Sequence, residues 1–396
     1  MFESIAAAPP DPILGLTDAF QQDTRPEKIN LTIGVYRDET GQTPVLQTVK
    51  EAEQRLLASE TTKGYLGIDG SPDFKRLAAQ LTVGERLAAE RIATFQTPGG
   101  TGALRVAADF LAKNLGHSRV WCSTPTWPNH LSIFESAGLE TKGYPYLAAD
   151  RTSLDFAAML DLLEREGRAG DVICLHACCH NPTGIDPTRE QWQEIAELTA
   201  QRGMLPLLDF AYHGFGDGLE EDRLAIAELT KQHNELLICS SYSKNFGLYS
   251  ERVGAMLAVC PAAEAAARVG SCIKQTVRSN YSNPPRHGGA IVATILADDS
   301  LRQRWQGELD QMRQRIHSVR AQFVQAMQAT DCAVDFSFLL SQRGMFSYSG
   351  LSPLQVDWLR TNKGIYIVGS GRINVAGITA QNLSPLTAAI AEATRL

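Results

Sequence analysis

A lysine near the middle of the chain has the surroundings that amine chemistry needs. Lys244 lies within the run Ser241-Tyr242-Ser243-Lys244-Asn245-Phe246-Gly247-Leu248, directly after the apolar segment 236–239. A lysine at the end of a buried strand is costly to keep charged, so it is either paired or used as an amine that condenses with an aldehyde. A surface lysine in a serine-rich loop is the other interpretation of so short a motif. The other motifs of the chain decide between the two.

A carboxylate and two polar side chains are candidates for binding a flat ring that contains a nitrogen atom. Asp209 follows the apolar run 205–208, and a carboxylate beside apolar residues must be paired or functional. A buried carboxylate keeps a nearby ring nitrogen protonated. Tyr212 supplies a phenol on the same turn, and Asn181 lies in the run 180–184 after another predicted strand. An ordinary turn is the alternative for Asn-Pro-Thr-Gly.

A glycine-rich segment predicts an anion site. The run 99–102, Gly-Gly-Thr-Gly, opens a predicted helix, where main-chain N–H groups favour negative charge. A plain glycine-rich turn is the alternative. The segment is not a dinucleotide fingerprint, because Arg105 occupies the last glycine position, and no P-loop motif is present. The further donors that we expect to face the same anion are Ser241, Ser243 and Arg252.

One aromatic residue and two arginines are the remaining candidates for ligand binding. Trp127 lies in a Pro-Thr-Trp-Pro loop, where it either stacks on a flat ring or fills the core. Arg278 and Arg372 suit bidentate binding of carboxylates, with a surface arginine as the alternative for each. His130 is interpreted as a buried hydrogen-bond partner that could orient Asp209. No metal-binding spacing occurs, so no metal is expected.

The segments that position these residues alternate between strands and helices. Strands are predicted at 94–96, 120–123, 172–176, 205–208 and 236–239. Helices are predicted from 102 to a stop at Gly116, over 156–163 and around 192–196. This alternation predicts an α/β fold with a mainly parallel sheet, which binds ligands at the carboxyl ends of its strands. Most of the candidate residues follow a predicted strand.

The pattern changes after residue 300 and predicts a second domain. Apolar residues recur every three or four positions from Leu301 to Met327, as in one long helix. This helix is expected to lead out of a large domain into a smaller one. The predicted division is an N-terminal arm with part of the small domain at 1–45, a large domain at 46–312 and a small C-terminal domain at 313–396.

Composition excludes several classes of protein. The chain has 396 residues, of which 44% are hydrophobic, and a formal net charge of -7. Because Lys and Arg are dispersed, no nucleic-acid binding is expected. No apolar run approaches a membrane span, the N-terminal residues do not form a signal peptide, and the eight cysteines lack C-x-x-C spacing. We therefore expect a cytoplasmic protein without membrane partners.

Together these motifs resemble those of class I, fold-type I pyridoxal-phosphate aminotransferases, and among them the bacterial aspartate aminotransferases. The resemblance covers nearly the whole chain. It implies a large domain with a mainly parallel seven-stranded sheet sandwiched by helices, and a smaller α+β domain formed by both termini. The motifs that carry it, in family order, are Asp11 to Leu14, Tyr65 to Gly67, Gly99 to Leu104, His180 to Gly184, Asp209 to Tyr212, Ser241 to Arg252, Ser282 to Pro285 and Arg372 to Gly377.

By position, the resemblance implies a role for each residue. Lys244 resembles the lysine that binds the cofactor aldehyde, and Asp209 the partner of the ring nitrogen. Tyr212 and Asn181 resemble the partners of the ring phenolic oxygen, and Trp127 the residue that stacks on the ring. The residues that resemble the phosphate-binding group are Gly100, Thr101, Ser241, Ser243 and Arg252, with Tyr65 reaching in from the second subunit.

The resemblance also implies a substrate site and a reaction. Arg372 resembles the arginine that binds the substrate α-carboxylate, and Arg278 the neighbouring subunit's arginine for a side-chain carboxylate; Gly34 and Phe346 resemble site-lining residues. The implied reaction is reversible amino transfer from L-aspartate to 2-oxoglutarate, giving oxaloacetate and L-glutamate, by a ping-pong pyridoxal-phosphate mechanism. The implied assembly is a homodimer with shared sites that binds amino acids and 2-oxoacids.

Other activities of the same fold remain open. An aromatic-amino-acid aminotransferase with overlapping dicarboxylate activity is the nearest alternative, because such enzymes commonly keep both arginines. A pyridoxal-phosphate lyase is disfavoured by the dicarboxylate interpretation of Arg278. A regulatory protein that binds the cofactor without catalysis is disfavoured by the intact Lys244 and by the absence of an appended DNA-binding domain.

Overall fold

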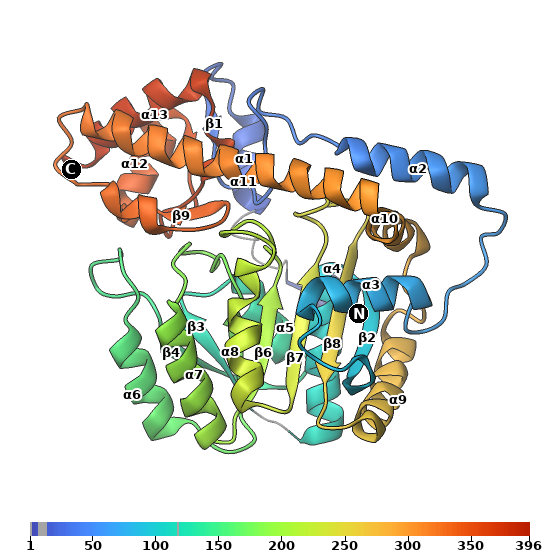
Figure 1. Ribbon diagram of the computed structural model, residues 1–396. Helices are drawn as coiled ribbons and strands as arrows, with labels where there is room; N and C mark the ends of the chain where they lie inside the picture. Colours follow the sequence, from blue (N-terminus) through green and yellow to red (C-terminus); the bar gives the residue numbers. More distant parts are fainter. Residues whose placement is uncertain (1, 7–13, 117–118) are drawn as a thin grey trace. The chain divides into compact units, whose positions relative to one another are not determined.

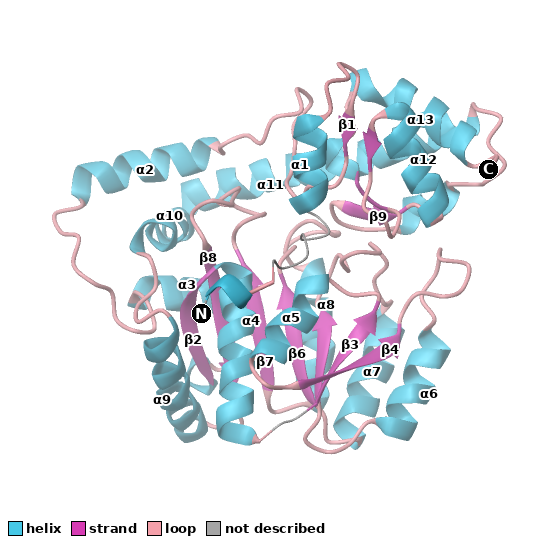
Figure 2. Cartoon of the chain, turned by 180° about the vertical axis from the view of Figure 1, so that it is seen from behind, coloured by secondary structure: helices cyan, strands magenta, loops and turns pink. Residues whose placement is uncertain are grey.

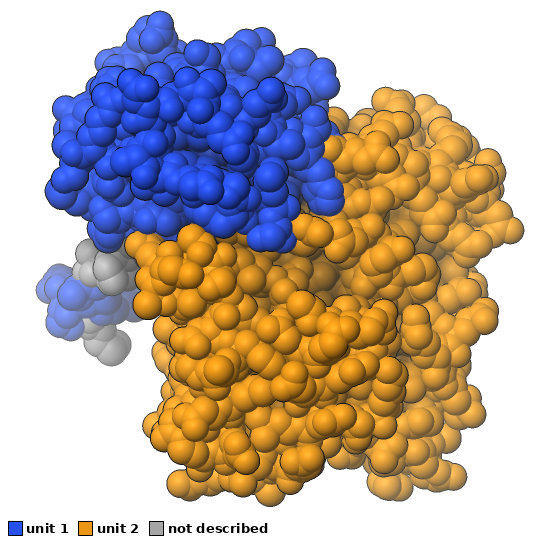
Figure 3. All heavy atoms as spheres, turned by 60° about the vertical axis from the view of Figure 1, so that its left-hand side comes forward, with its two compact units in different colours: residues 1–42, 315–341, 345–396 blue, residues 43–314, 342–344 orange. Residues whose placement is uncertain are grey.

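The part of the chain that the structure describes divides into two compact units. The computed structural model describes residues 2–6, 14–116 and 119–396. Unit 1 contains Met1–Gln42, Arg315–Ser341 and Met345–Leu396, and unit 2 contains Thr43–Gln314 and Gln342–Gly344 (Figure 3). Of the predicted motif Asp11 to Leu14, the first three residues lie outside the described residues.

Unit 2 is built on a seven-stranded sheet with the strand order β2-β8-β7-β6-β5-β3-β4. β8 runs antiparallel to both of its neighbours, and the remaining pairs are parallel. The predicted mainly parallel seven-stranded sheet is therefore confirmed. Its strands are β2 (Ile92–Pro98), β3 (Arg119–Thr124), β4 (Glu140–Pro145), β5 (Val172–His176), β6 (Leu205–Phe210), β7 (Leu236–Ser241) and β8 (Val253–Val259).

The apolar sequence of the central strands follows from their position. Every residue of β5, β7 and β8 is buried, as expected for strands covered on both faces. β8 is absent from the predicted strands, because a short uniformly apolar run does not distinguish a strand from a helix segment by periodicity.

Helices cover both faces of this sheet (Figures 1 and 2). α6, α7 and α8 lie on one face, and α4, α5 and α9 on the other. The core between the second set and the sheet includes Phe95, Leu104, Phe134 and Ile273. The helices of unit 2 are α2 (Gln47–Ser59), α3 (Pro72–Val83), α4 (Gly99–Phe110), α5 (Pro128–Ser136), α6 (Phe156–Glu166), α7 (Arg189–Gln201), α8 (Leu224–Gln232), α9 (Ala263–Asn280) and α10 (Arg286–Ala297).

Local sequence explains where several helices begin, and one end differs from the prediction. The Ser71 side chain accepts a hydrogen bond from Phe74 N at the start of α3, and Thr188 forms a capping box at the start of α7. The helix predicted to stop at Gly116 has its α-helical part end at Phe110. A π turn, Leu111–Leu115, follows before Gly116 takes a left-handed conformation with φ 62°. The predicted stop was correct, but the widened last turn was not foreseen.

Unit 1 combines residues from both ends of the chain. β1 (Ile29–Asn30) pairs in parallel with β10 (Ile365–Tyr366), and β9 (Phe346–Tyr348) pairs antiparallel with β11 (Arg372–Asn374). Its helices are α1 (Leu14–Gln22), α12 (Pro353–Lys363) and α13 (Ala380–Ala393). α11 (Asp299–Gln328), which confirms the predicted long helix, contributes residues to both units. No helix among the described residues is long and apolar enough to span a membrane.

Candidate active site

Four candidate residues of unit 2 lie at one edge of the parallel part of the sheet. Lys244 follows β7, Asn181 follows β5, Trp127 follows β3, and Asp209 is the last residue but one of β6. Because these strands are parallel neighbours, their carboxyl ends meet at the same edge, where α/β sheets bind ligands. The predicted position of these residues at strand ends is confirmed, with Asp209 inside its strand rather than after it.

Asp209 is held by a histidine from the start of a different helix. His130, in the first turn of α5, places Nε2 at 2.9 Å from Asp209 Oδ2, and the Ala211 amide donates to Oδ1 at 3.1 Å. His130 Nδ1 lies 2.9 Å from Thr126 Oγ1. Since an ionised carboxylate only accepts, His130 donates through Nε2 and Thr126 donates to Nδ1. The expectation that His130 orients Asp209 is confirmed.

The surroundings of Asp209 keep it ionised although it is buried. Burial alone would raise the pKa of its carboxyl group. The hydrogen bond from His130 is the largest of the effects that oppose burial, and the pKa of Asp209 lies below its ordinary value. A buried carboxylate that stays ionised can hold a positively charged nitrogen.

The Lys244 amine lies above an aromatic ring and is a weaker base than an ordinary lysine. Its Nζ is 5.0 Å from the centroid of the Tyr212 ring. Burial lowers the pKa of Lys244, Asp209 opposes this, and Arg252 lowers the pKa further. A lysine whose neutral form is favoured is a better nucleophile and a better proton acceptor than one in solvent.

The start of α4 and the loop after β7 together form a cradle that suits an anion. Arg252 Nη1 donates to Ser243 Oγ at 3.3 Å, and Ser243 N donates to Ser241 Oγ at 3.4 Å. Gly99 has φ +75°, and a Cβ added there would lie 2.4 Å from Arg252 Nη2. A Cβ at Gly100 would lie 3.0 Å from Ser241 Cβ. The positive φ of Gly99 and these close approaches favour glycine, and they bring N–H groups, hydroxyls and a guanidinium close together.

A row of rings leads from Trp127 toward Asn181. The Trp127 and His130 rings are 5.3 Å apart, those of His130 and His176 5.0 Å, and those of His176 and His180 4.3 Å. Burial, with the nearby histidines, lowers the pKa of His176 well below its ordinary value, so its ring is neutral. Asn181 is buried next to His180.

The turn that carries Asn181 is anchored by a carboxylate. Asp186 accepts from the main-chain N–H groups of Cys179 at 2.7 Å and His180 at 2.8 Å. His180 Nδ1 lies 2.8 Å from Thr183 Oγ1, and His180 Nε2 lies 2.8 Å from Ser123 Oγ. Asn181 is therefore held by its neighbours on both sides.

Tyr65 and Arg278 form a second group, made of exposed residues. Tyr65 is 96% exposed, and Arg278 at the end of α9 is exposed as well. Arg278 Nη1 donates to Ser282 Oγ, which donates to Asn283 Oδ1 at 3.0 Å. Asn283 Nδ2 donates to the carbonyl oxygen of Leu66 at 2.8 Å. Tyr65 and Arg278 are thus linked to each other, and no described hydrogen bond joins them to Lys244.

The third group lies within unit 1. The Arg372 guanidinium is 4.1 Å from the centroid of the Phe346 ring, and its Nη2 donates to the carbonyl oxygen of Thr32 at 2.7 Å. A Cβ at Gly34 would lie 2.9 Å from Phe346 Cζ. Arg372 is only 4% exposed. The predicted residues Gly34, Phe346 and Arg372 are therefore neighbours, and the arginine is rigidly held.

The sequence interpretation missed several residues that support these groups. Thr126 orients His130, Asp186 anchors the Asn181 turn, and Gln96 donates hydrogen bonds to the carbonyl oxygens of Asp69 and Pro285. A polar residue inside the apolar strand 92–98 is the signal that could have found Gln96. The spacing His-Asn-Pro-Thr-Gly-Ile-Asp could have drawn attention to Asp186.

Two clusters of possible metal ligands occur among the described residues, and the carboxylate of each cluster has other partners. In the first, His130, His176 and Asp209, the carboxylate binds His130. In the second, formed by Cys178, Cys179 and Asp222, the carboxylate accepts from the amides of Gly214, Gly216 and Asp217, while burial raises the pKa of the Cys178 thiol well above its ordinary value. The expectation that the chain needs no metal stays a prediction.

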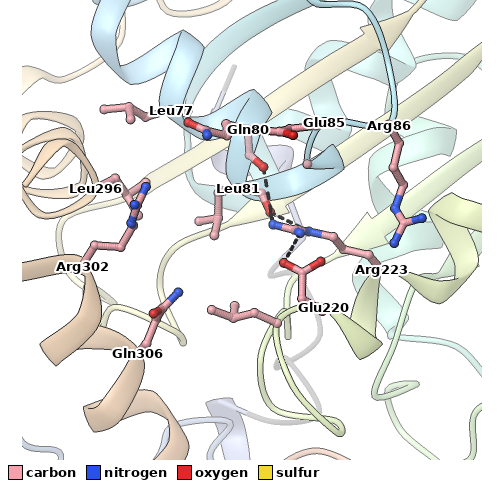
Figure 4. Close-up of a pocket in the computed structure, with 12 residues that line it drawn as sticks. Leu77, Gln80, Leu81, Glu85, Arg86, Glu220, Arg223, Leu296, Arg302 and Gln306 are labelled. Carbon is pink, nitrogen blue, oxygen red and sulfur yellow. Dashed lines mark hydrogen bonds and ion pairs between the residues drawn. The ribbon is translucent and has the colours of Figure 1, made fainter. Parts of the chain in front are cut away.

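A separate cavity of about 670 Å³ in unit 2 is lined by none of the predicted site residues (Figure 4). Its buried arginine, Arg223, donates to the carbonyl oxygens of Gln80 and Leu81 at the end of α3 and pairs with Glu220. Arg302 pairs with Asp299. Arg223 therefore satisfies helix-end carbonyls, and the site of interest is the one around Lys244.

Comparison with known proteins identifies the family. Residues 26–390 match the model of the family described as aminotransferase class I and II. The chain belongs to this family. The mainly parallel seven-stranded sheet, with Lys244 after β7 and Asp209 buried in β6, is consistent with this family.

The most similar relatives include both aspartate and aromatic-amino-acid aminotransferases. The chain is 57% identical over 393 residues to the aspartate aminotransferase of Escherichia coli (strain K12), covering 98% of this chain and 99% of that protein. It is 48% identical over 394 residues to the aromatic-amino-acid aminotransferase of Pseudomonas aeruginosa, covering 99% of this chain and 98% of that protein. Among solved structures, the aromatic-amino-acid aminotransferase from Burkholderia pseudomallei covalently bound to pyridoxal phosphate has a TM-score of 0.97 at 44% identity, covering 100% of this chain and 99% of that chain.

Proposed function

We propose that this protein is a pyridoxal-phosphate-dependent aspartate aminotransferase. It transfers the amino group of L-aspartate reversibly to 2-oxoglutarate, giving oxaloacetate and L-glutamate in a ping-pong sequence. The observation that carries the proposal is the pairing at the sheet edge of a lysine of lowered pKa with a buried aspartate kept ionised by His130. The 57% identity to the Escherichia coli aspartate aminotransferase supports the choice of substrate.

The residues around Lys244 fit this cofactor. Asp209 offers an ionised carboxylate to a protonated pyridine nitrogen, and the cradle at Gly99 and Gly100 offers N–H groups to a phosphate. The buried His176, whose Nε2 has no hydrogen-bond partner among the described residues, packs against His130, the residue that binds Asp209. When bound, pyridoxal phosphate supplies an electron-withdrawing ring that stabilises negative charge on the substrate carbon.

Each residue then has a task that its surroundings support. Thr101, Ser241, Ser243 and Arg252 bind the phosphate, with Tyr65 contributed by the neighbouring subunit. Tyr212 and Asn181 bind the phenolic oxygen, and Trp127 stacks on the ring. Lys244 binds the cofactor aldehyde between turnovers and, as an amine of lowered pKa, accepts the proton from the substrate Cα at its Nζ.

Two arginines divide the recognition of the substrate. Arg372, fixed over the Phe346 ring, binds the α-carboxylate, with Gly34 lining the same part of the site. Arg278, exposed within its own chain, binds the side-chain carboxylate of a substrate held by the neighbouring subunit. A chain of formal net charge -7 repels anions at long range, so local arginines are needed to capture a dicarboxylate.

The same proposal includes the assembly and the location. A tyrosine that is 96% exposed and an exposed arginine, linked by a polar network, suit a surface that a second copy covers. We therefore propose a homodimer with two shared sites, in the cytoplasm, with the domain limits 1–45, 46–312 and 313–396 given above. Sedimentation of the purified protein measures the dimer directly.

One assay separates this function from its nearest alternative. Initial rates are measured with aspartate, glutamate, tyrosine and phenylalanine against 2-oxoglutarate. A higher kcat/KM for aspartate than for tyrosine and phenylalanine supports an aspartate aminotransferase. Higher values for the aromatic substrates support an aromatic-amino-acid aminotransferase, which the 48% identity to the Pseudomonas aeruginosa enzyme keeps as the second candidate.

A further inference from the structure

Gln96 contacts the segment that carries Tyr65 and the segment that follows Arg278 at the end of α9. It belongs to β2, the edge strand next to β8, and is 1% exposed. Its main-chain N–H donates to the carbonyl oxygen of Asp69 at 3.0 Å, and its main-chain oxygen accepts from the Tyr281 hydroxyl at 3.3 Å. In an antiparallel ladder, alternate residues direct these groups away from the partner strand. At Gln96 the free sheet edge is thus covered by the two segments themselves.

The Gln96 side chain is enclosed by the same two segments. Its Nε2 donates to the carbonyl oxygen of Pro285 at 2.6 Å. A Cβ added at Gly70 would lie 2.5 Å from Gln96 Cβ, and a Cβ added at Gly289 would lie 2.4 Å from Gln96 Nε2. Both positions therefore require glycine as long as Gln96 keeps its place. One buried amide sets the separation of the 65–70 segment from the 281–289 segment, which directly follows the end of α9 where Arg278 lies.

The two segments are also joined above Gln96. Asn283 Nδ2 donates to the carbonyl oxygen of Leu66, and Asn283 Oδ1 accepts from Ser282 Oγ, the group that receives the Arg278 hydrogen bond. The side chains of Tyr65 and Arg278 are exposed, so their positions depend on the main chain that carries them. That main chain is held at Gln96 and at Asn283.

We propose that Gln96 is a positioning residue that sets the place of Arg278 and Tyr65 in the site of the neighbouring subunit. The inference rests on the proposed function, in which these two residues act across a dimer. Gln96 touches neither substrate nor cofactor, and it acts through the main chain at Asp69 and Pro285. Substitution of Gln96 is therefore expected to weaken substrate binding in the partner's site and to leave the site around Lys244 of its own chain unchanged.

The first test uses Gln96→Met, which keeps the unbranched shape and removes the donor to Pro285. We expect the Kd for maleate, a dicarboxylate probe measured by calorimetry on the holoenzyme, to rise about three- to tenfold. The Kd for 3-phenylpropionate, which has one carboxylate, is expected to change by less than about twofold. Gln201→Met, on the exposed surface of α7, is the matched control. Equal weakening of both probes, or of neither, contradicts the inference.

The second test determines which of the two active sites is impaired by Gln96→Met. In one hybrid dimer, a chain with both Lys244→Ala and Gln96→Met is paired with a wild-type chain, so the only working Lys244 faces the altered segments. In the other, Gln96→Met and Lys244→Ala are on different chains, so the working Lys244 faces unaltered segments. We expect the KM for aspartate to rise in the first hybrid and to stay unchanged in the second, with little change in kcat in either.

The outcomes distinguish this inference from the proposed function. A defect in the second hybrid alone means that Gln96 acts on its own anion cradle through Thr97 to Gly99, and it overturns the inference. Equal defects in both hybrids do the same. Arg278→Ala is tested in the same two arrangements. If Arg278→Ala impairs the site that contains Lys244 of its own chain, the proposal of shared sites is refuted, and the role of Gln96 is not what has failed. If Gln96→Met does not fold, Asn283→Ala, on the half-buried surface loop, replaces it with the same expectations.

Discussion

His130 Nε2 lies 2.9 Å from Asp209 Oδ2, although the two residues are 79 positions apart in the chain. Both side chains are buried, and Thr126 Oγ1 at 2.9 Å from Nδ1 completes the hydrogen bonding of the imidazole. The ionisation of a buried carboxylate thereby depends on a histidine that needs no contact with a ligand.

Removing this histidine is expected to shift the acidic limb of the pH profile. The pKa of Asp209 is lowered in the folded chain because the His130 hydrogen bond and its other neighbours outweigh burial, so in His130→Phe burial loses its strongest opponent and the pKa rises. At a given acidic pH less Asp209 is ionised, and kcat/KM for aspartate falls at a higher pH than in the wild type. His233→Phe, a half-buried histidine bound to Thr199, is the control. An acidic limb at the wild-type position would contradict the role of His130.

The assignment of Lys244 can be tested by trapping the cofactor. Lys244→Ala removes the amine that binds the aldehyde and accepts the Cα proton, and we expect kcat to fall by at least about 10⁴-fold. Borohydride reduction followed by mass spectrometry should place the cofactor on the peptide containing Lys244. Lys231→Ala, whose lysine pairs with Glu228, should keep wild-type activity. A label on any other lysine refutes the assignment.

The two arginines are expected to differ in which substrates they affect. Arg278→Ala should lower kcat/KM for aspartate by about 100-fold or more, because the side-chain carboxylate loses its charged partner, and should change the value for phenylalanine little. Arg372→Lys should lower both values, since every amino acid has an α-carboxylate and lysine cannot bind it in a fork. Arg268→Ala, exposed on the same helix as Arg278, is the control. If Arg278→Ala lowers kcat/KM for aspartate and for phenylalanine equally, Arg278 does not bind the side-chain carboxylate of the substrate.

Asp186 predicts a pH dependence of stability. Burial raises its pKa to about 6, although the His180 and Cys179 amides oppose this. The folded state then binds more protons than the unfolded state between the ordinary carboxyl pKa and about 6, so the free energy of unfolding falls as the pH rises through this window. In Asp186→Asn the position does not titrate, and the slope should flatten. Urea unfolding at several pH values measures it, with exposed Asp161→Asn as control; an unchanged slope would show that Asp186 is not its source.

Those features that depend on local sequence were predicted well. β5 occupies the predicted residues 172–176, and α11 spans the predicted long helix. Lys244 and Asp209 were located because a charged residue at the end of an apolar run is a local signal. Their proximity followed from the parallel order of the strands, which is a general property of α/β folds.

The remaining features depend on partners that leave no mark in the sequence. The main-chain N–H and the Nε2 of Gln96 donate to the carbonyl oxygens of Asp69 and Pro285, and any residue type supplies a carbonyl oxygen. Asp186 similarly binds two main-chain N–H groups. The antiparallel direction of β8 depends on the loop that carries Lys244 back along the sheet.

The pairing of β1 with β10 has a consequence for synthesis on the ribosome. Ile29 pairs with Ile365, and Arg25 donates to the carbonyl oxygen of Arg360, 335 residues later in the chain. At roughly 5–20 residues per second, the first segment waits about 20–70 seconds before its partner strand is translated. Until then its apolar side chains, Ile29 and Leu31, lack the strand that they pair beside. A nascent chain truncated before residue 365 should therefore be more susceptible to proteases in this segment than the released protein.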